Sequence, residues 1–205
     1  MKITNIILLG IGGQGTLTMM EMLAMAAEAA GEEVRVLSRV SLARLGGSGM
    51  CHVRLGPAAS PAIPTGEAHI LIALELSEVL RALPMAGQGA LAFANLYRRM
   101  PVAAGVNDLH YPTREEIEQA LQEAGVTGIF VPELLPPSPG ETAQPAESRV
   151  NILMLGVFAG YTNLLPRALL EQAIEQRLPR FAAENARTFM AGWNYGASLH
   201  APKTT

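Results

Sequence analysis

The chain has 205 residues, of which 49% are hydrophobic and 5% aromatic, and its formal net charge is −3. This length provides one sizeable α/β domain with enough apolar material for a sheet that is buried on both faces. The weak negative charge and the absence of a long Lys/Arg run argue against a nucleic-acid binder. The longest apolar stretches are far below the roughly 18 residues of a membrane span, and no secretory signal follows Met1.

The scarcity of metal-binding and acidic side chains narrows the chemistry further. Cys51 is the single cysteine, which excludes an internal disulfide and fits a reducing cytoplasm. One cysteine also cannot hold an iron–sulfur cluster, which generally takes four cysteine ligands. The four histidines are scattered, and Asp108 is the only aspartate. The chain therefore lacks the side chains for most self-contained hydrolysis or phosphoryl transfer.

The first half of the chain alternates apolar runs with helical segments. Strands are predicted at 3–9, 33–37, 50–56, 69–76 and 89–96, and helices at 16–30 and from 77 to 83. The alternating residues at 50–56 predict a strand with one exposed face. A glycine-rich loop at 41–49 and a proline-rich connection at 57–67 separate these elements.

The second half becomes helical after one more strand. Thr113 and Glu116 predict the capped start of a helix that Gly125 ends, and 126–132 is predicted to be the last parallel strand. An irregular Pro-rich loop is expected at about 133–147, helices at about 148–193, and a flexible tail at about 194–205. The order predicts a single domain over 1–205, an α/β fold of the Rossmann-like, doubly wound kind, with a mostly parallel sheet and the C-terminal helices packed on it.

The stretch "LLGIGGQGTLTMM" runs from a strand through glycines into a helix. Gly10, Gly12 and Gly15 match the spacing G-x-G-x-x-G, and the positive end of the following helix favours an anion there. An NAD site also needs an acidic residue about 20 positions later. The residues at 37–40 include no carboxylate, although Arg39 could face the 2′-phosphate of NADP. A nucleotide site, glycines used only for packing, and contact with a phosphate-bearing ligand or a partner subunit all stay open.

Several motifs in order resemble a known family. They are "GIGGQGTLTMMEMLAMAAEAAG", "GGSGMCHVRLG", "IPTGEAHILIALE", "VNILMLG" and "ENARTFMAG". Together they resemble the gamma-type domain of 2-oxoacid:ferredoxin oxidoreductases, also called the pyruvate/ketoisovalerate oxidoreductase gamma-type domain. Within that group, the chain is most similar to the beta subunit of indolepyruvate ferredoxin oxidoreductase. The likeness extends from about Lys2 to about Trp193.

The resemblance implies a division of labour between two subunits. Such enzymes cleave a 2-oxoacid on thiamine diphosphate, pass electrons through iron–sulfur clusters to ferredoxin, and release an acyl-CoA. This chain has neither the cysteines for a cluster nor the Gly-Asp-Gly that opens a thiamine diphosphate motif. It would be the smaller, cytoplasmic subunit, inactive alone, with no catalytic residue or metal ligand of its own. The larger subunit would hold thiamine diphosphate, magnesium and the 4Fe-4S clusters, and contact of this chain with the co-substrate coenzyme A stays open.

The resemblance also implies a set of binding residues and leaves the substrate open. The implied set is Gly10, Gly12, Gly13, Gln14, Gly15, Thr16, Gly46, Gly47, Ser48 and Asn95, and Arg44 is added to it on its own chemistry. Arg44, flanked by glycine loops, suits a phosphate or a carboxylate. The two loops are expected to line a crevice between the first and third strands. For His52, Arg54 and Asn151, a binding role and a purely structural role stay equally open. The structural role would be the exposed face of a strand for His52 and Arg54, and helix packing for Asn151.

The stretch "SRVSLARLGGS" departs from the family pattern, in which an acid, a His-Gly segment and a Gln-Arg pair are usual. Indolepyruvate, phenylglyoxylate, another aryl 2-oxoacid and a branched-chain 2-oxoacid therefore all stay open. An apolar docking surface for the larger subunit is expected on the helices after Ser148, with Met154, Leu155 and Phe158 as candidates. A free-standing NADP-linked reductase and a non-catalytic scaffold are the alternative functions.

Overall fold

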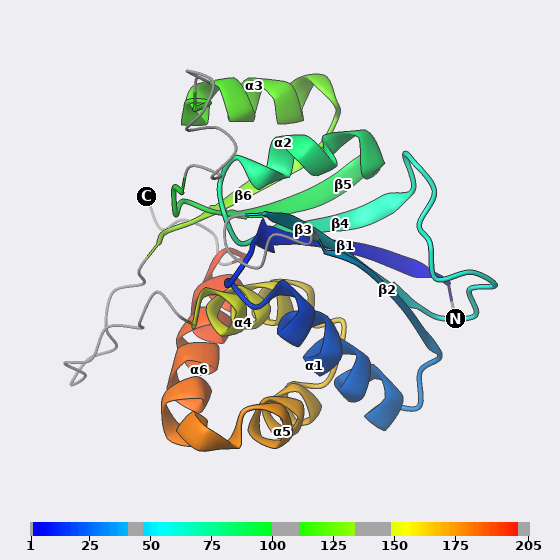
Figure 1. Ribbon diagram of the computed structural model, residues 1–205, viewed down its shortest axis with the longest axis vertical. Helices are drawn as coiled ribbons and strands as arrows, with labels where there is room; N and C mark the ends of the chain where they lie inside the picture. Colours follow the sequence, from blue (N-terminus) through cyan, green and yellow to red (C-terminus); the bar gives the residue numbers. More distant parts are fainter. Residues whose placement is uncertain (1, 41–46, 100–110, 134–148, 201–205) are drawn as a thin grey trace.

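The computed structural model describes residues 2–40, 47–99, 111–133 and 149–200. It forms a six-stranded sheet with helices on both faces (Figure 1). The elements in chain order are β1 (Thr4–Ile11), α1 (Thr16–Ala29), β2 (Val34–Val40), β3 (Ser48–Leu55), β4 (Ala68–Ala73), α2 (Glu78–Ala82), β5 (Ala86–Asn95), α3 (Arg114–Glu123), β6 (Thr127–Val131), α4 (Val150–Thr162), α5 (Arg167–Arg177) and α6 (Ala182–Ser198). Short 3₁₀ turns at Leu83–Met85 and Pro179–Phe181 precede β5 and α6.

The strand order across the sheet is β2-β3-β1-β4-β5-β6. Strands β1, β4, β5 and β6 are parallel, whereas β3 runs antiparallel to both of its neighbours, β1 and β2. Only residues 41–47 separate the end of β2 from the start of β3, whereas neighbouring parallel strands need a crossover of roughly a dozen residues or more. The predicted α/β class and mostly parallel sheet are confirmed, and the antiparallel β3 between β1 and β2 is the new feature.

Strand β3 corrects one expectation. Its residues from Cys51 to Leu55 are all buried, so the predicted exposed face is wrong. Segment 57–67 covers the polar side of the strand: His52 Nδ1 accepts a hydrogen bond from Ile63 N at 3.0 Å, and Arg54 donates to the carbonyl oxygens of Ser60 and Ala62. Both faces of this inner strand are covered. The alternating residues therefore reflect one face packed in the apolar core and one face hydrogen-bonded to segment 57–67.

The helices form two layers. Helices α2 and α3 lie on one face of the sheet, and α1, α4, α5 and α6 lie on the other (Figure 1). Every residue of α4 from Val150 to Gly160 is buried, because this helix lies between the sheet and α6. Met154, Leu155 and Phe158 have no solvent exposure, so the expectation that they form a docking surface is wrong.

Helices α4 and α6 pack with their backbones in direct contact. We call the four residues responsible, Gly156, Gly160, Gly192 and Gly196, the α4–α6 glycine contact. A Cβ atom added at any of them would lie between 2.1 and 2.3 Å from a backbone oxygen of the opposite helix. No side chain larger than hydrogen fits there without moving the helices apart, so the glycines fix how closely α6 lies on α4.

The ends of the later helices follow the sequence signals in part. The predicted cap of α3 is confirmed, because the Thr113 hydroxyl accepts from Glu116 N and the Glu116 carboxylate accepts from Thr113 N. Helix α6 continues to Ser198, beyond the position at which a flexible tail was expected. Most of the Pro-rich stretch lies outside the described residues. Among the helices described, none is long and apolar enough to cross a membrane.

Candidate functional site

The first glycine loop, residues 12–15, connects β1 to α1. Gly13 and Gly15 have backbone φ angles of +98° and +81°, which residues other than glycine rarely adopt. Within the described chain, no side chain caps the start of α1, and its first turn contains no acidic residue. A Cβ atom at Gly13 would meet nothing within 4 Å. The positive end of α1 therefore lies behind a loop that leaves open space in front of it.

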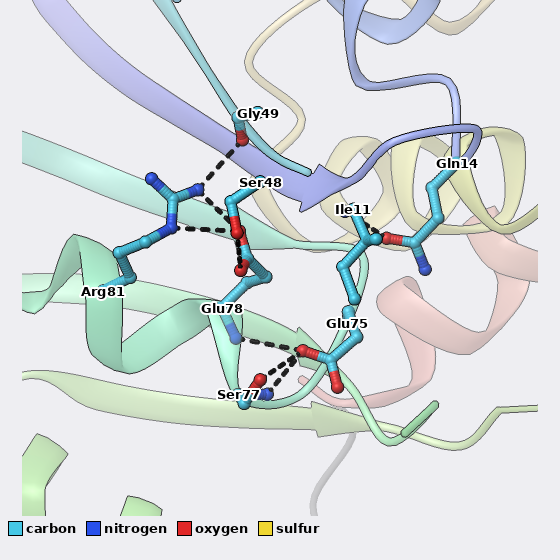
Figure 2. A network of polar contacts seen from close by, with 8 residues as sticks. All are labelled: Ile11, Gln14, Ser48, Gly49, Glu75, Ser77, Glu78 and Arg81. Carbon is cyan, nitrogen blue, oxygen red and sulfur yellow. Dashed lines mark hydrogen bonds and ion pairs between the residues drawn. The ribbon is translucent and has the colours of Figure 1, made fainter. Parts of the chain in front are cut away.

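Gln14 fills the position where nucleotides usually enter this kind of sheet. Its Oε1 accepts from Ile11 N at 2.7 Å (Figure 2), and its Nε2 donates to the carbonyl oxygen of Leu74 at 3.1 Å. The side chain thus bridges the carboxyl ends of β1 and β4, between which the connecting helices change from one face of the sheet to the other. Such a switch point is the usual ligand crevice of an open α/β sheet. Here the Gln14 amide spans it.

The second glycine loop is joined to the first by direct hydrogen bonds. Gly12 N donates to the carbonyl oxygen of Gly47 at 2.8 Å, and the β1–β3 pairing extends to Ile11 and Ser48. The expected crevice between the first and third strands is therefore absent where the structure describes these loops, because the strands are hydrogen-bonded neighbours. The open space beside the first loop lies on another side of it.

Two buried glutamates hold the loops from the α2 side. Glu78 accepts from the Ser48 hydroxyl at 2.7 Å and pairs with Arg81, which also donates to the carbonyl oxygen of Gly49 (Figure 2). The Glu75 carboxylate accepts from the Ser77 hydroxyl and from the backbone N–H groups of residues 77, 78 and 99. These hydrogen bonds show that both carboxylates have a structural role in holding the loops.

Tyr111 completes the contacts of Glu75 by donating its hydroxyl hydrogen bond to this carboxylate. Burial, and then the hydrogen bond to Glu75, raise the pKa of Tyr111. Sequence reasoning missed the two glutamates, although "LELSE" places both of them directly after a buried strand.

A hollow of about 520 Å³ lies on the other side of the first loop, between this loop, the start of α4 and the connection from α5 to α6. Asn151 at the start of α4 donates its Nδ2 hydrogen to the carbonyl oxygen of Gly15 at 3.3 Å. Segments 136 residues apart in the sequence thereby form one wall. The lining residues include Gly13, Gln14, Gly15, Thr18, Arg149, Asn151, Arg177, Arg180, Phe181 and Asn185.

Three guanidinium groups give this hollow its positive charge. Arg177 is paired with Glu21 at 2.6 Å. Arg149 and Arg180 have no carboxylate partner in the described parts of the chain; their guanidinium carbons lie 5.5 and 5.3 Å from the centre of the Phe181 ring. The Phe181 side chain is 48% exposed. Two free cations, an exposed ring and the start of α1 make a site suited to a phosphate-bearing ligand with an aromatic group.

Sequence reasoning also missed these arginines, although a signal existed. Arg149 directly precedes α4, and Arg180 lies in the turn that leads into α6. A cation at the start of a helix opposes the helix dipole and is unfavourable there. Two such arginines, each at the start of a different helix, therefore indicate that their positive charge serves to bind an anion. What the sequence did not supply was that both helix starts face the same glycine loop.

The described residues among those expected at the site fall into three groups. Gly13, Gln14 and Gly15 line the hollow, whereas Gly12, Gly47 and Ser48 join the two loops. Gly10, Thr16 and Asn95 lie inside the protein. A Cβ atom at Gly10 would lie 2.6 Å from Thr16 Oγ1. Arg44 and Gly46 lie outside the described residues.

Asn95 ends β5 and has no solvent exposure. Its Oδ1 accepts from Tyr97 N at 2.9 Å, and its Nδ2 donates to the carbonyl oxygen of Pro132 at 3.3 Å. Both ends of the side chain are therefore engaged with the protein, and the amide connects the loops that follow β5 and β6.

The geometry does not favour the NADP reductase. In a dinucleotide-binding sheet the second strand lies beside the first, but here β3 separates β2 from β1. The end of β2 is therefore two strand spacings, roughly 9.5 Å, from β1. Arg39 is in register with Met50, which packs on the α2 side of the sheet. It therefore lies on the face opposite to α1.

The residues present do not fit an iron–sulfur cluster. Across the described ranges, no three His, Cys, Asp or Glu side chains converge as a metal site. Cys51 is buried, and burial is the main cause of its raised thiol pKa. A second chain would have to supply the cluster ligands of any reaction that uses one.

Comparison with known proteins agrees with this picture. A family model described as pyruvate ferredoxin/flavodoxin oxidoreductase matches residues 5–195. The indolepyruvate oxidoreductase subunit IorB of Archaeoglobus fulgidus is 31% identical over 95% of this chain and 96% of its own length. The keto/oxoacid ferredoxin oxidoreductase gamma subunit of Geobacter sulfurreducens has a TM-score of 0.65 at 17% identity, over 95% of this chain and 99% of that chain.

A longer protein contains the same fold as one part. The 2-oxoglutarate:ferredoxin oxidoreductase of Magnetococcus marinus, solved with 2-oxoglutarate, coenzyme A and succinyl-CoA bound, has a TM-score of 0.69 at 17% identity. The match covers all of this chain and 32% of that one. At this identity the structural likenesses establish the fold alone, whereas the family match spans nearly the whole sequence. The chain belongs to the pyruvate ferredoxin/flavodoxin oxidoreductase family.

Proposed function

We propose that this chain is the cluster-free subunit of a 2-oxoacid:ferredoxin oxidoreductase and is inactive alone. A larger companion subunit holds thiamine diphosphate, its magnesium ion and the iron–sulfur clusters, and passes electrons to ferredoxin. The family match and the curated relatives, which are named as subunits, support this assignment. The side chains of this chain support it too, because one buried cysteine cannot bind a cluster.

The part of the reaction that falls to this chain is binding coenzyme A, the acyl acceptor. The observation that carries the proposal is the arginine-lined hollow at the first glycine loop. Coenzyme A carries several phosphate charges and an adenine ring. Arg149 and Arg180 supply positive charge and are paired with no carboxylate of the described residues, and the ring of Phe181 offers a surface for a flat group. Binding there would complete the active site that the companion subunit begins.

The proposed 2-oxoacid is an aryl one such as indolepyruvate. The name of the Archaeoglobus relative supports this choice, and the hollow itself does not distinguish one 2-oxoacid from another. A competition among indolepyruvate, phenylglyoxylate and a branched-chain 2-oxoacid in the assembled complex would decide the substrate. The highest kcat/KM is expected for indolepyruvate.

The assignment is tested by mixing the purified chain with its companion subunit. We expect dye reduction that requires a 2-oxoacid and coenzyme A, and we expect it only when both chains are present. Equal turnover by the companion subunit alone would contradict the proposal. Catalysis by this chain alone, or saturable NADPH binding to it, would contradict it as well.

The coenzyme A site is tested by Arg149→Ala and Arg180→Ala in the assembled complex. Each change removes a guanidinium from the hollow, and the loss of a charge-assisted contact costs about 1.5–3 kcal/mol. The KM for coenzyme A should rise roughly tenfold to a hundredfold while the KM for the 2-oxoacid stays constant. Arg187→Ala, which removes an exposed arginine from the middle of α6, is the matched control. Unchanged coenzyme A kinetics in both variants would place the ligand elsewhere.

A further inference from the structure

The exposed arginines of this protein are unevenly distributed. Within the parts of the chain that the structure describes, five arginines form ion pairs with carboxylates, and Arg54 is buried among hydrogen-bond acceptors. Six others reach solvent without a carboxylate partner: Arg39, Arg98, Arg99, Arg149, Arg180 and Arg187. All of these except Arg187 lie at the edge of the sheet where β1, β2, β4 and β5 end.

Four separate segments bring these cations to one edge. Arg39 is the penultimate residue of β2, and Arg98 and Arg99 follow the end of β5. Arg149 and Arg180 line the hollow beside the first glycine loop, at the end of β1. Arg98 lies over the ring of Tyr111, whose hydroxyl is bonded to the buried Glu75. The carboxyl edge therefore carries several exposed arginines, of which Arg98, Arg149 and Arg180 lie against aromatic rings.

Where the structure describes them, the acidic side chains at this edge do not pair with these arginines. Glu75 and Glu78 are buried, and their oxygens are turned to donors inside the protein (Figure 2). Among the described residues, exposed carboxylates near this edge occur at Glu115 and Glu133, in the first turn of α3 and after β6, beyond β5. Glu184, in the first turn of α6, is half-buried. Within the described ranges, Arg39, Arg98 and Arg99 are therefore left without a carboxylate partner.

Exposed apolar side chains occur at the same edge. Four large hydrophobic residues of the described chain are clearly exposed, and two of them, Leu17 at 40% and Phe181 at 48%, flank the start of α1. Arginines mixed with aromatic and aliphatic side chains are typical of protein–protein interfaces, where lysine and glutamate are depleted. Both the side-chain composition of this edge and its positive charge are therefore typical of a docking surface.

We propose that this carboxyl edge is the surface on which the companion subunit docks, and that Arg39, Arg98 and Arg99, which lie outside the hollow, meet an acidic face of that subunit. The existence of a companion rests on the proposed function; the location and the charge of the interface rest on the residues above. A second copy of this chain is a poor occupant, because a two-fold contact would set identical rows of cations against each other. Docking here would also enclose the hollow between the two subunits.

The test is the charge reversal of two arginines that lie outside the hollow. The double variant Arg98→Glu/Arg99→Glu should bind the purified companion subunit roughly tenfold to a hundredfold more weakly in low salt, chiefly through slower association. The loss should shrink as the salt concentration rises. The double variant Arg98→Lys/Arg99→Lys keeps the charges and should retain most of the affinity. Arg187→Glu, in α6, is the matched control and should bind like the unchanged chain.

Each result decides between the two levels of the proposal. Circular dichroism and the thermal midpoint of the isolated variant establish that it is folded. If the unchanged chain binds its companion and the reversed double variant binds equally well, the docking surface is wrong while the proposed function stands. If the unchanged chain neither binds nor activates the companion, the proposed function itself fails. If the isolated chain forms dimers that the reversal dissociates, the occupant is a second copy and the proposal is overturned.

Discussion

The α4–α6 glycine contact and the first glycine loop use the same residue type for opposite purposes. In the helix pair, the glycines remove volume so that two backbones can touch, and an added Cβ atom would overlap a backbone oxygen. In the loop, Gly13 and Gly15 adopt backbone angles that other residues avoid, and the space in front of Gly13 is empty. The helix glycines allow close packing, whereas the loop glycines leave space at the start of α1.

The difference shows how to recognise a functional glycine. The spacing is similar in both regions, since Gly12 and Gly15 are three residues apart and Gly156 and Gly160 are four. The two regions differ in what an added methyl group would contact. In the helices it would contact main-chain atoms, at Gly15 the side-chain amide of Asn151, and at Gly13 nothing. Stability should therefore depend most on the helix glycines, and ligand binding on the loop.

The largest expected effect is on the helix side of this comparison. Gly192→Ala places a Cβ atom 2.3 Å from the carbonyl oxygen of Leu153, so the helices must separate. Alanine favours the helix itself by about 1 kcal/mol, but overpacking should outweigh this and leave a net loss of about 3 kcal/mol. Urea denaturation measures the change in midpoint. Ala197→Leu adds volume on the exposed side of α6 and should cost little; an equal effect of the two changes would refute the contact.

A smaller effect is expected in the loop. Gly15→Ala meets Asn151 Nδ2 at 2.5 Å and takes a left-handed backbone angle, and it should cost about 2 kcal/mol. Gly13→Ala has the angle without the clash and should cost about 1 kcal/mol. The double variant Gly15→Ala/Asn151→Ala removes the clashing amide, so a double-mutant cycle should show a coupling between the two sites. Additive costs would mean that the loop relaxes freely.

The smallest effect concerns pH and extends the comparison to the sheet. The helix contact is uncharged, whereas β3 buries His52, whose Nδ1 accepts from Ile63 N and whose Nε2 has no partner among the described residues. Burial, followed by the charges of Arg39 and Arg54, lowers the pKa of His52. The folded state then binds fewer protons than the unfolded state just below the ordinary histidine pKa of about 6.5.

Stability should therefore decrease as the pH falls below about 6.5, until the lower pKa of the folded state is reached. Urea unfolding of the unchanged chain between pH 7 and pH 5 should show this decrease. His52→Gln cannot titrate, so its unfolding free energy should vary less over the same interval. A stability that rises on acidification, or an unchanged slope in the variant, would contradict the lowered pKa.

Much of the fold followed from local signals. The strands at β1, β4 and β5, the cap at Thr113 and the helices after Ser148 are where apolar runs and end signals predicted them. The exposed face of β3 and the flexible start of the tail were misjudged for a common reason. A sequence window shows which side chains are polar, but not whether a distant segment covers them.

The candidate site was less predictable. The first glycine loop was found because its spacing is local, yet the crevice was placed on the wrong side of it. The antiparallel β3 occupies the position beside β1, and Gln14 bridges β1 to the loop after β4. The hollow instead uses Arg149 and Arg180, which reach Gly13 only through the packing of α4 and α6. The sequence showed these arginines as solitary cations.

The sequence by itself determined the order of the elements, the glycine turn before α1 and the family, because these depend on residues that are close along the chain or on motifs in series. Tertiary structure alone decided which glycines open a site and which close a helix pair. It also decided that cations from four segments share one edge of the sheet. The physical reason is that contact and charge act through space, and only the packed fold brings residues 13, 98, 149 and 180 to the same end of the molecule.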